Sequence, residues 1–195
     1  MSLDRPPSEL AFVQFGALAR HTDTRGSFRE IWRAAEPGGG GQPASVAPRW
    51  PFVQANLSTS ATGVLRGLHL HRRQLDYWVV ASGRAFVALV DVRVPLEGSD
   101  EPPIVETREL GPDDWVVIPP GVAHGFLALE PLELIYFVTN WYDGSDELGF
   151  AWDDPAAGVA WPTVTATGDG RPIVSERDAS NPSLTDLVAR IRAES

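Results

Sequence analysis

The sequence predicts an all-β sandwich or barrel, because short runs of strand-forming residues recur along most of its length. These runs are rich in Val, Ile, Phe, Tyr and Trp and are separated by Gly, Pro, Ser or Asp, as expected for strands joined by turns. They are residues 52–60, 63–71, 77–83, 84–93, 115–120, 124–129 and 133–142. Because 195 residues suffice for one hydrophobic core but are few for two, we expect a single domain over residues 1–195.

Residues 183–193 predict a short C-terminal helix, since apolar residues recur there at helical spacing and Ser183 is a suitable N-cap. The apolar stripe consists of Leu184, Leu187, Val188 and Ile191. The Gly- and Pro-rich stretch 36–45 predicts a flexible loop, and 94–103 predicts a longer connection between strands.

Composition excludes several classes of function. Sixteen basic and 26 acidic residues give a net charge of -10, which argues against nucleic acid or an anionic membrane as a general partner. Every basic residue is arginine and there is no cysteine, so lysine chemistry, disulfides and thiolate metal sites are excluded. The N-terminus lacks the pattern of a signal peptide, and no stretch approaches the ~18 apolar residues of a membrane span, so we expect a cytoplasmic protein.

The segment "RGLHLH", residues 66–71, contains two histidines two residues apart. In a strand, His69 and His71 would share one face, roughly 7 Å apart, with Arg66 on the other face. Asp76 follows, and His124 comes after a Pro-Pro-Gly turn. Three histidines and one carboxylate suit zinc, iron, manganese or nickel, so one alternative is a metal-dependent enzyme that uses these four residues.

The spacing of these residues resembles the two cupin motifs. His69-x-His71, Asp76 and Gly83 resemble the first motif with Asp in place of Glu, and "PPGVAHGF" (119–126) resembles the second. This resemblance implies a cupin-type double-stranded β-helix, that is, a jelly-roll barrel. Because cupins have many functions, the motif alone does not define the activity.

A more specific resemblance extends over about residues 8–185. The segments "DTRGSFREIW", "FVQANLS", "RGLH", "VIPPGVAHGFLAL", "LIYFVTNWY" and "VSERDASNPSL" resemble, in order, the dTDP-4-dehydrorhamnose 3,5-epimerase family. The resemblance implies a sugar-nucleotide isomerase without a metal or other cofactor. It also implies a homodimer that exchanges N-terminal strands and a dTDP-linked 4-keto-6-deoxyhexose as substrate.

The family resemblance implies a proton-transfer mechanism beside the C4 ketone of the sugar, at C3, C5 or both. His69 matches the base, Asp178 the carboxylate that orients it, and Tyr136 the acid on the opposite face of the sugar. A base and an acid on opposite faces can invert a carbon through an enolate intermediate. An aspartate that accepts a hydrogen bond from one ring nitrogen raises the basicity of the other.

The resemblance also implies a set of substrate-binding residues, in which arginines would provide the positive potential that this acidic chain otherwise lacks. These residues are Arg25, Phe28, Glu30, Gln54, Asn56, Arg66, His71, Asp76, His124, Trp141 and Tyr142.

One position departs from the family pattern. Asp76 occupies the place of a lysine that polarises the ketone in the family, and the chain has no lysine to substitute for it. Three interpretations stay open: Arg72 or Arg73 replaces the lysine, burial protonates Asp76, or the reaction has changed. A further alternative is a non-catalytic relative that only binds a sugar nucleotide.

Overall fold

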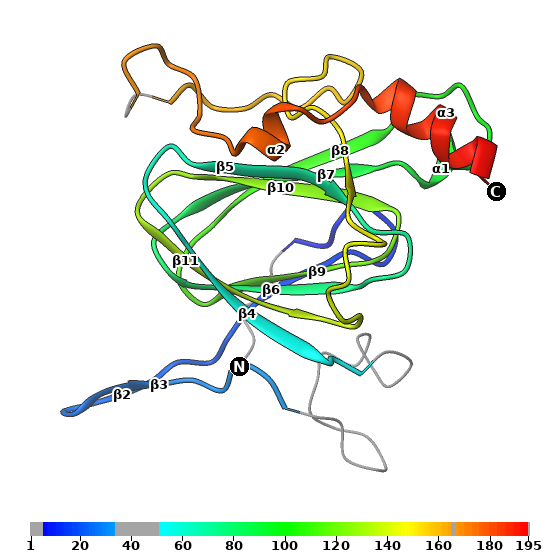
Figure 1. Ribbon diagram of the computed structural model, residues 1–195. Helices are drawn as coiled ribbons and strands as arrows, with labels where there is room; N and C mark the ends of the chain where they lie inside the picture. Colours follow the sequence, from blue (N-terminus) through cyan, green and yellow to red (C-terminus); the bar gives the residue numbers. More distant parts are fainter. Residues whose placement is uncertain (1–5, 34–50, 165–166, 195) are drawn as a thin grey trace.

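The computed structural model describes residues 6–33, 51–164 and 167–194, and its main feature is a barrel of two five-stranded antiparallel sheets (Figure 1). The first sheet has the order β1-β9-β6-β11-β4 and the second β12-β5-β10-β7-β8. This arrangement confirms the all-β barrel that the strand pattern predicted, and it is the jelly-roll barrel that the resemblance to the cupin motifs implied.

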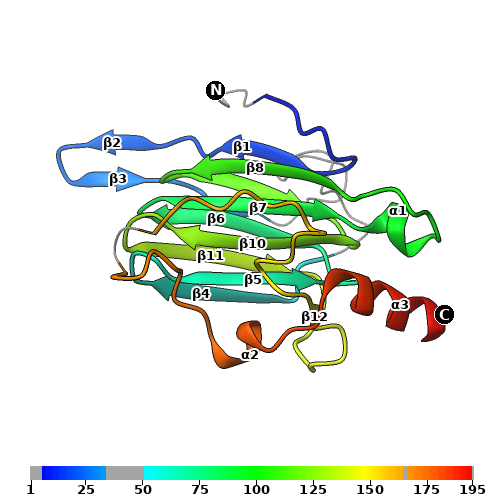
Figure 2. The same cartoon turned by 90° about the horizontal axis from the view of Figure 1, so that it is seen from above.

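Strands of the first sheet are β1 (Gln14–Ala17), β4 (Gln54–Ser60), β6 (Asp76–Ser82), β9 (Asp114–Ile118) and β11 (Leu132–Val138). The second sheet contains β5 (Leu65–Leu70), β7 (Ala85–Asp91), β8 (Ile104–Leu110), β10 (Val122–Ala128) and β12 (Leu148–Gly149). A separate hairpin of β2 (His21–Asp23) and β3 (Gly26–Phe28) projects away from the barrel in both views (Figures 1 and 2).

Every run that the sequence predicted to be extended contains a strand. Strand β8 and the short strands β1, β2, β3 and β12 lie outside the predicted runs. Strand β8 is an edge strand whose only buried residue is Leu110, so it lacks a strong apolar pattern. The connection 94–103 begins within a short helix, α1 (Arg93–Leu96), and the chain also forms a short helix α2 (Glu176–Ala179), which the sequence did not predict. The predicted loop 36–45 lies outside the described residues.

Apolar side chains fill the space between the two sheets. Val80, Val116 and Leu134 of the first sheet pack with Val87 and Leu89 of the second, and each is almost fully buried. Burial of this size is the main favourable term in folding, at about 25 cal/mol per Å² of apolar surface. The two sheets also enclose the cavity described below, whose lining contains many polar residues.

Helix α3 (Leu184–Glu194) covers the outer face of the second sheet (Figure 1). Its four buried residues are those of the predicted stripe, and they pack in a cluster with Leu68, Leu70 and Val90. The Oγ atom of Ser183 accepts a 3.1 Å hydrogen bond from the Asp186 backbone N–H, which confirms the predicted N-cap. In the described residues, no helix has the length and apolar character needed to cross a bilayer.

A bulge in β5 determines which residues of "RGLHLH" face the interior. His69 pairs with His124, whereas Arg66 pairs with Phe126, so three steps along β5 correspond to two along β10. Strict alternation placed Arg66 on the face opposite His69, and that expectation was wrong. The extra residue brings both side chains to the same cavity.

Candidate active site

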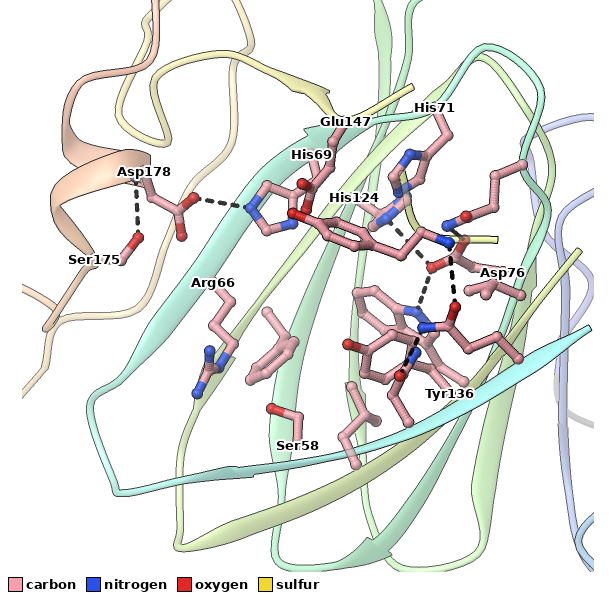
Figure 3. Close-up of a pocket in the computed structure, with 18 of the residues that line it drawn as sticks. Ser58, Arg66, His69, His71, Asp76, His124, Tyr136, Glu147, Ser175 and Asp178 are labelled. Carbon is pink, nitrogen blue, oxygen red and sulfur yellow. Dashed lines mark hydrogen bonds and ion pairs between the residues drawn. The ribbon is translucent and has the colours of Figure 1, made fainter. Parts of the chain in front are cut away.

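A polar cavity of about 430 Å³ lies between the two sheets (Figure 3). Its lining includes residues of β4, β6 and β11 from the first sheet, and of β5 and β10 from the second. The lining residues are Gln54, Asn56, Ser58, Arg66, His69, His71, Gln74, Asp76, Trp78, His124, Phe126, Leu134, Tyr136, Val138, Tyr142, Glu147, Ser175, Arg177 and Asp178.

His69 and Asp178 form a hydrogen-bonded pair at one wall of the cavity. Nε2 of His69 lies 2.9 Å from Oδ1 of Asp178. Because a carboxylate only accepts hydrogen bonds, Nε2 carries the proton and Nδ1 keeps its lone pair. Burial alone would raise the pKa of Asp178, but hydrogen bonds from His69 and the Gly67 backbone N–H outweigh burial, so its pKa lies below the ordinary value.

Helix α2 places the carboxylate of this pair. Ser175 is its N-cap and accepts a 3.0 Å hydrogen bond from the Asp178 backbone N–H. This bond fixes the single turn that carries Asp178 against β5. The pair thus joins segments that are 109 residues apart in the sequence.

Tyr136 lines the cavity from the first sheet, whereas His69 lines it from the second. Its phenol has a raised pKa, first because burial disfavours the phenolate and next because Asp76 is negative. The hydroxyl therefore keeps its proton at neutral pH. An imidazole with a free lone pair and a protonated phenol on opposing sheets can take a proton from one face of a ligand and return one to the other.

Asp76, His71 and His124 lie close together in the lining of the cavity. One carboxylate oxygen of Asp76 accepts from Gln74 Nε2 at 2.7 Å, and the other from Trp78 Nε1 at 3.1 Å. Nε2 of His124 lies 3.7 Å from Asp76 Oδ2. Burial lowers the pKa of His124 to about 4, because the effect of burial is larger than the opposite effect of the nearby Asp76. Of the four metal ligands of the alternative hypothesis, His71, Asp76 and His124 therefore lie close together. The fourth, His69, is instead hydrogen-bonded to Asp178.

Two charged residues of the cavity were missed by sequence reasoning. Glu147 forms a 2.7 Å ion pair with Arg177 and a hydrogen bond with the hydroxyl of the exposed Tyr142. These interactions outweigh the effect of burial, so the pKa of Glu147 is lowered. Arg177 precedes Asp178 in "SERDA", so the motif itself was the available signal. Glu147 lies next to β12, which is too short to show as a strand pattern.

Of the predicted substrate-binding residues, Gln54, Asn56, Arg66 and Tyr142 line the cavity, as do His71 and His124. Trp141 lies on its rim, in an adjoining surface hollow. Arg25 and Phe28 lie on the projecting hairpin and Glu30 just beyond it, outside the cavity of their own chain.

The side chains of Arg72 and Arg73 lie outside the cavity, an arrangement that does not favour either of them as a replacement for the lysine. Their backbone N–H groups bind the Asp146 carboxylate, and the Arg73 guanidinium reaches Ser145. Neither side chain lines the cavity, whereas Asp76 does. The cationic side chains that do line it are Arg66 and Arg177.

A jelly-roll barrel whose interior holds a His–Asp pair opposite a tyrosine defines an enzyme of the cupin type, with proton transfer as the chemistry its side chains can perform. The sequence matches the model of the dTDP-4-dehydrorhamnose 3,5-epimerase family over residues 9–186. The chain belongs to this family, and it is an isomerase.

Individual relatives agree with this assignment. The chain is 36% identical over 155 residues to the spore coat polysaccharide biosynthesis protein SpsL of Bacillus subtilis, covering 77% of this chain and 95% of SpsL. It is 36% identical over 171 residues to the dTDP-4-dehydrorhamnose 3,5-epimerase of Sinorhizobium fredii, covering 85% and 81% of the two chains.

Solved structures give the same result for the fold. The rmlC epimerase of Mycobacterium tuberculosis superposes with a TM-score of 0.76 at 29% identity, covering 96% of both chains. The 3'-monoepimerase ChmJ of Streptomyces bikiniensis, solved in complex with dTDP-quinovose, gives a TM-score of 0.75 at 26% identity, covering 95% of this chain and 89% of ChmJ.

Proposed function

We propose that the protein inverts carbon next to the C4 ketone of a dTDP-linked 4-keto-6-deoxyhexose, with His69 as the base and Tyr136 as the acid. The observation that carries the proposal is the 2.9 Å hydrogen bond between His69 Nε2 and Asp178, which leaves Nδ1 as the basic atom in the cavity. Asp178 would stabilise the imidazolium that forms when Nδ1 takes the proton.

The bonds that break and form in the reaction follow from these two roles. The C–H bond next to the ketone breaks, its proton moves to His69, and the electron pair forms an enolate. Tyr136 gives its proton to the same carbon from the other face, where the enolate electron pair forms the new C–H bond and the ketone is restored. The His69 imidazolium then loses its proton to solvent, and the Tyr136 phenolate takes one from solvent. Since burial and Asp76 raise the pKa of Tyr136, its hydroxyl is the protonated partner that this step requires.

The nucleotide would lie toward the rim of the cavity. Gln54 Nε2 donates a 2.9 Å hydrogen bond to Asn56 Oδ1, and Gln54 Oε1 accepts from the Tyr142 backbone N–H, which ties these three together. Arg66 supplies a guanidinium suited to a diphosphate. In a homodimer that exchanged N-terminal strands, the projecting hairpin would carry Arg25 and Phe28 to the partner's cavity. The homodimer and a cytoplasmic location stay predictions.

Solvent exchange tests the proposal. The protein is incubated in D₂O with dTDP-4-keto-6-deoxyglucose, and deuterium at C3 and C5 is followed by NMR, together with the configuration of the product. We expect deuterium and inversion at one carbon or both, and weaker turnover with the UDP- and GDP-linked sugars. Tight binding of dTDP without exchange would instead identify a non-catalytic sugar-nucleotide-binding protein.

A further inference from the structure

We infer that His71, Asp76 and His124 form a binding site for a divalent transition-metal ion inside the cavity. One ligand atom from each residue lies within 4.8 Å of the other two. They come from three places in the barrel: His71 directly follows β5, Asp76 begins β6, and His124 lies within β10 (Figure 3). The inference concerns metal binding itself and does not depend on the proposed reaction.

The burial of the carboxylate is the first argument. Asp76 and His124 are each only 3% exposed. A carboxylate removed from water needs a compensating positive charge, because neutral hydrogen bonds offset only part of the lost solvation. Among the described residues, the side chains that donate hydrogen bonds to Asp76 are Gln74 and Trp78, through Nε2 and Nε1, and both are neutral. A metal ion would supply the missing charge.

The orientation of the two imidazoles is the second argument. Nδ1 of His71 lies 2.6 Å from the Asp146 backbone carbonyl, and Nδ1 of His124 lies 3.2 Å from the Val122 carbonyl. Since a carbonyl only accepts, each Nδ1 carries the proton and each Nε2 presents a lone pair. Metal-binding histidines are held in this way, with the second ring N–H donating to a carbonyl or carboxylate.

Three lone-pair donors therefore converge on one point, and two of them, His124 Nε2 and Asp76 Oδ2, face each other at 3.7 Å. Two imidazoles and one carboxylate form a ligand set that binds Zn²⁺ or Fe²⁺ and leaves coordination positions open. Bond lengths of about 2.0–2.2 Å would require the ligand atoms to close to roughly 3.5 Å. His71 is only half-buried and has room for this movement.

His69 stays outside this site, because its Nε2 is held by Asp178. The structure thus assigns separate tasks to the two histidines of "RGLHLH". If the proposed reaction is correct, the metal ion would stand where the family has its lysine and would polarise the C4 ketone oxygen as a Lewis acid.

Elemental analysis provides the test. Protein without a histidine tag is purified in chelator-free buffer, its metal content is measured, and chelator-treated protein is titrated with Zn²⁺ and Fe²⁺ by calorimetry. We expect about one ion per chain and a rise of the melting temperature when either ion is added. A wild-type protein that contains no transition metal and binds neither ion would overturn the inference.

Matched variants locate the ion. His71→Ala and Asp76→Asn should lose it, whereas His69→Asn should retain it, and circular dichroism establishes that each is folded. Loss of the ion in all three would contradict the three-ligand site and favour a site that includes His69. Since no substrate is used, failure of the metal site and failure of the epimerase proposal are separate results: an epimerase without metal overturns only this inference.

Discussion

The imidazole of His69 and the carboxylate of Asp178 lie 2.9 Å apart, although 109 residues separate them in the sequence. The carboxylate also accepts from the Gly67 backbone N–H at 3.4 Å, so it holds both the side chain and the strand that carries it. The position of Nδ1 in the cavity therefore depends on Asp178.

Asp178→Asn should lower the turnover number while leaving dTDP affinity unchanged. An asparagine amide can donate to Nε2, which would move the ring proton to Nδ1 and remove the basic lone pair. The loss should be up to roughly 10²–10⁴-fold, the usual contribution of general acid–base catalysis. The control is Asp153→Asn, an exposed aspartate outside the cavity, and equal activity of the two variants would remove the pair from the mechanism.

The pKa of Asp178 also predicts a pH dependence of stability. Hydrogen bonds from His69 and Gly67 outweigh burial and hold the pKa below the ordinary value of 3.8. A depressed carboxylate pKa contributes stability above the unfolded pKa, and this contribution is lost as the pH falls through the folded pKa. Urea unfolding should therefore show a wild-type advantage over Asp178→Asn near pH ~6 that shrinks below pH ~4. A difference that is constant across this range would show that the carboxylate charge does not contribute.

Tyr136→Phe should permit deuterium exchange but slow inversion, because proton removal by His69 is intact while the donor on the opposite face is lost. The matched control is Tyr77→Phe, which removes a hydroxyl that binds the Ile31 carbonyl away from the cavity. NMR of the product distinguishes exchange from inversion. If Tyr136→Phe loses both in a folded protein, the tyrosine is required for proton removal as well.

Gly67→Ala should destabilise the protein and disturb the cavity. Gly67 has a φ of +127°, and a Cβ there would lie 2.6 Å from the Gly125 Cα and 2.8 Å from the His124 carbonyl oxygen. Strain of this kind costs on the order of 1–3 kcal/mol, before the clash is added. Denaturant unfolding measures the effect, with Gly168→Ala as control because its Cβ would meet nothing within 4 Å. Equal stability of both variants would mean that β5 and β10 can separate at no cost.

The sequence predicted the barrel, the C-terminal helix and the residues of the His–Asp pair, each for a different reason. Alternation and turns are local signals, and the buried stripe of α3 follows directly from helical spacing. The partner of His69 could be predicted only from the family resemblance, since no periodic pattern links Gly67 or His69 to a residue on α2.

Other features could not be predicted because they depend on how strands pair. The bulge that turns Arg66 into the cavity arises from the register of β5 against β10. The separation of His69 from the other metal candidates depends on Asp178, which belongs to a distant segment. Glu147 precedes the two-residue strand β12 and Arg177 lies on the single turn α2, so the ion pair between them joins elements too short to show a secondary-structure pattern.

The most direct test of the proposed function is deuterium exchange by His69→Asn in D₂O, compared with wild type on dTDP-4-keto-6-deoxyglucose. The variant should bind dTDP with wild-type affinity, because the nucleotide contacts are unchanged, and its exchange at C3 and C5 should fall by roughly 10²–10⁴-fold. Exchange at the wild-type rate in a folded, dTDP-binding variant would show that His69 is not the base.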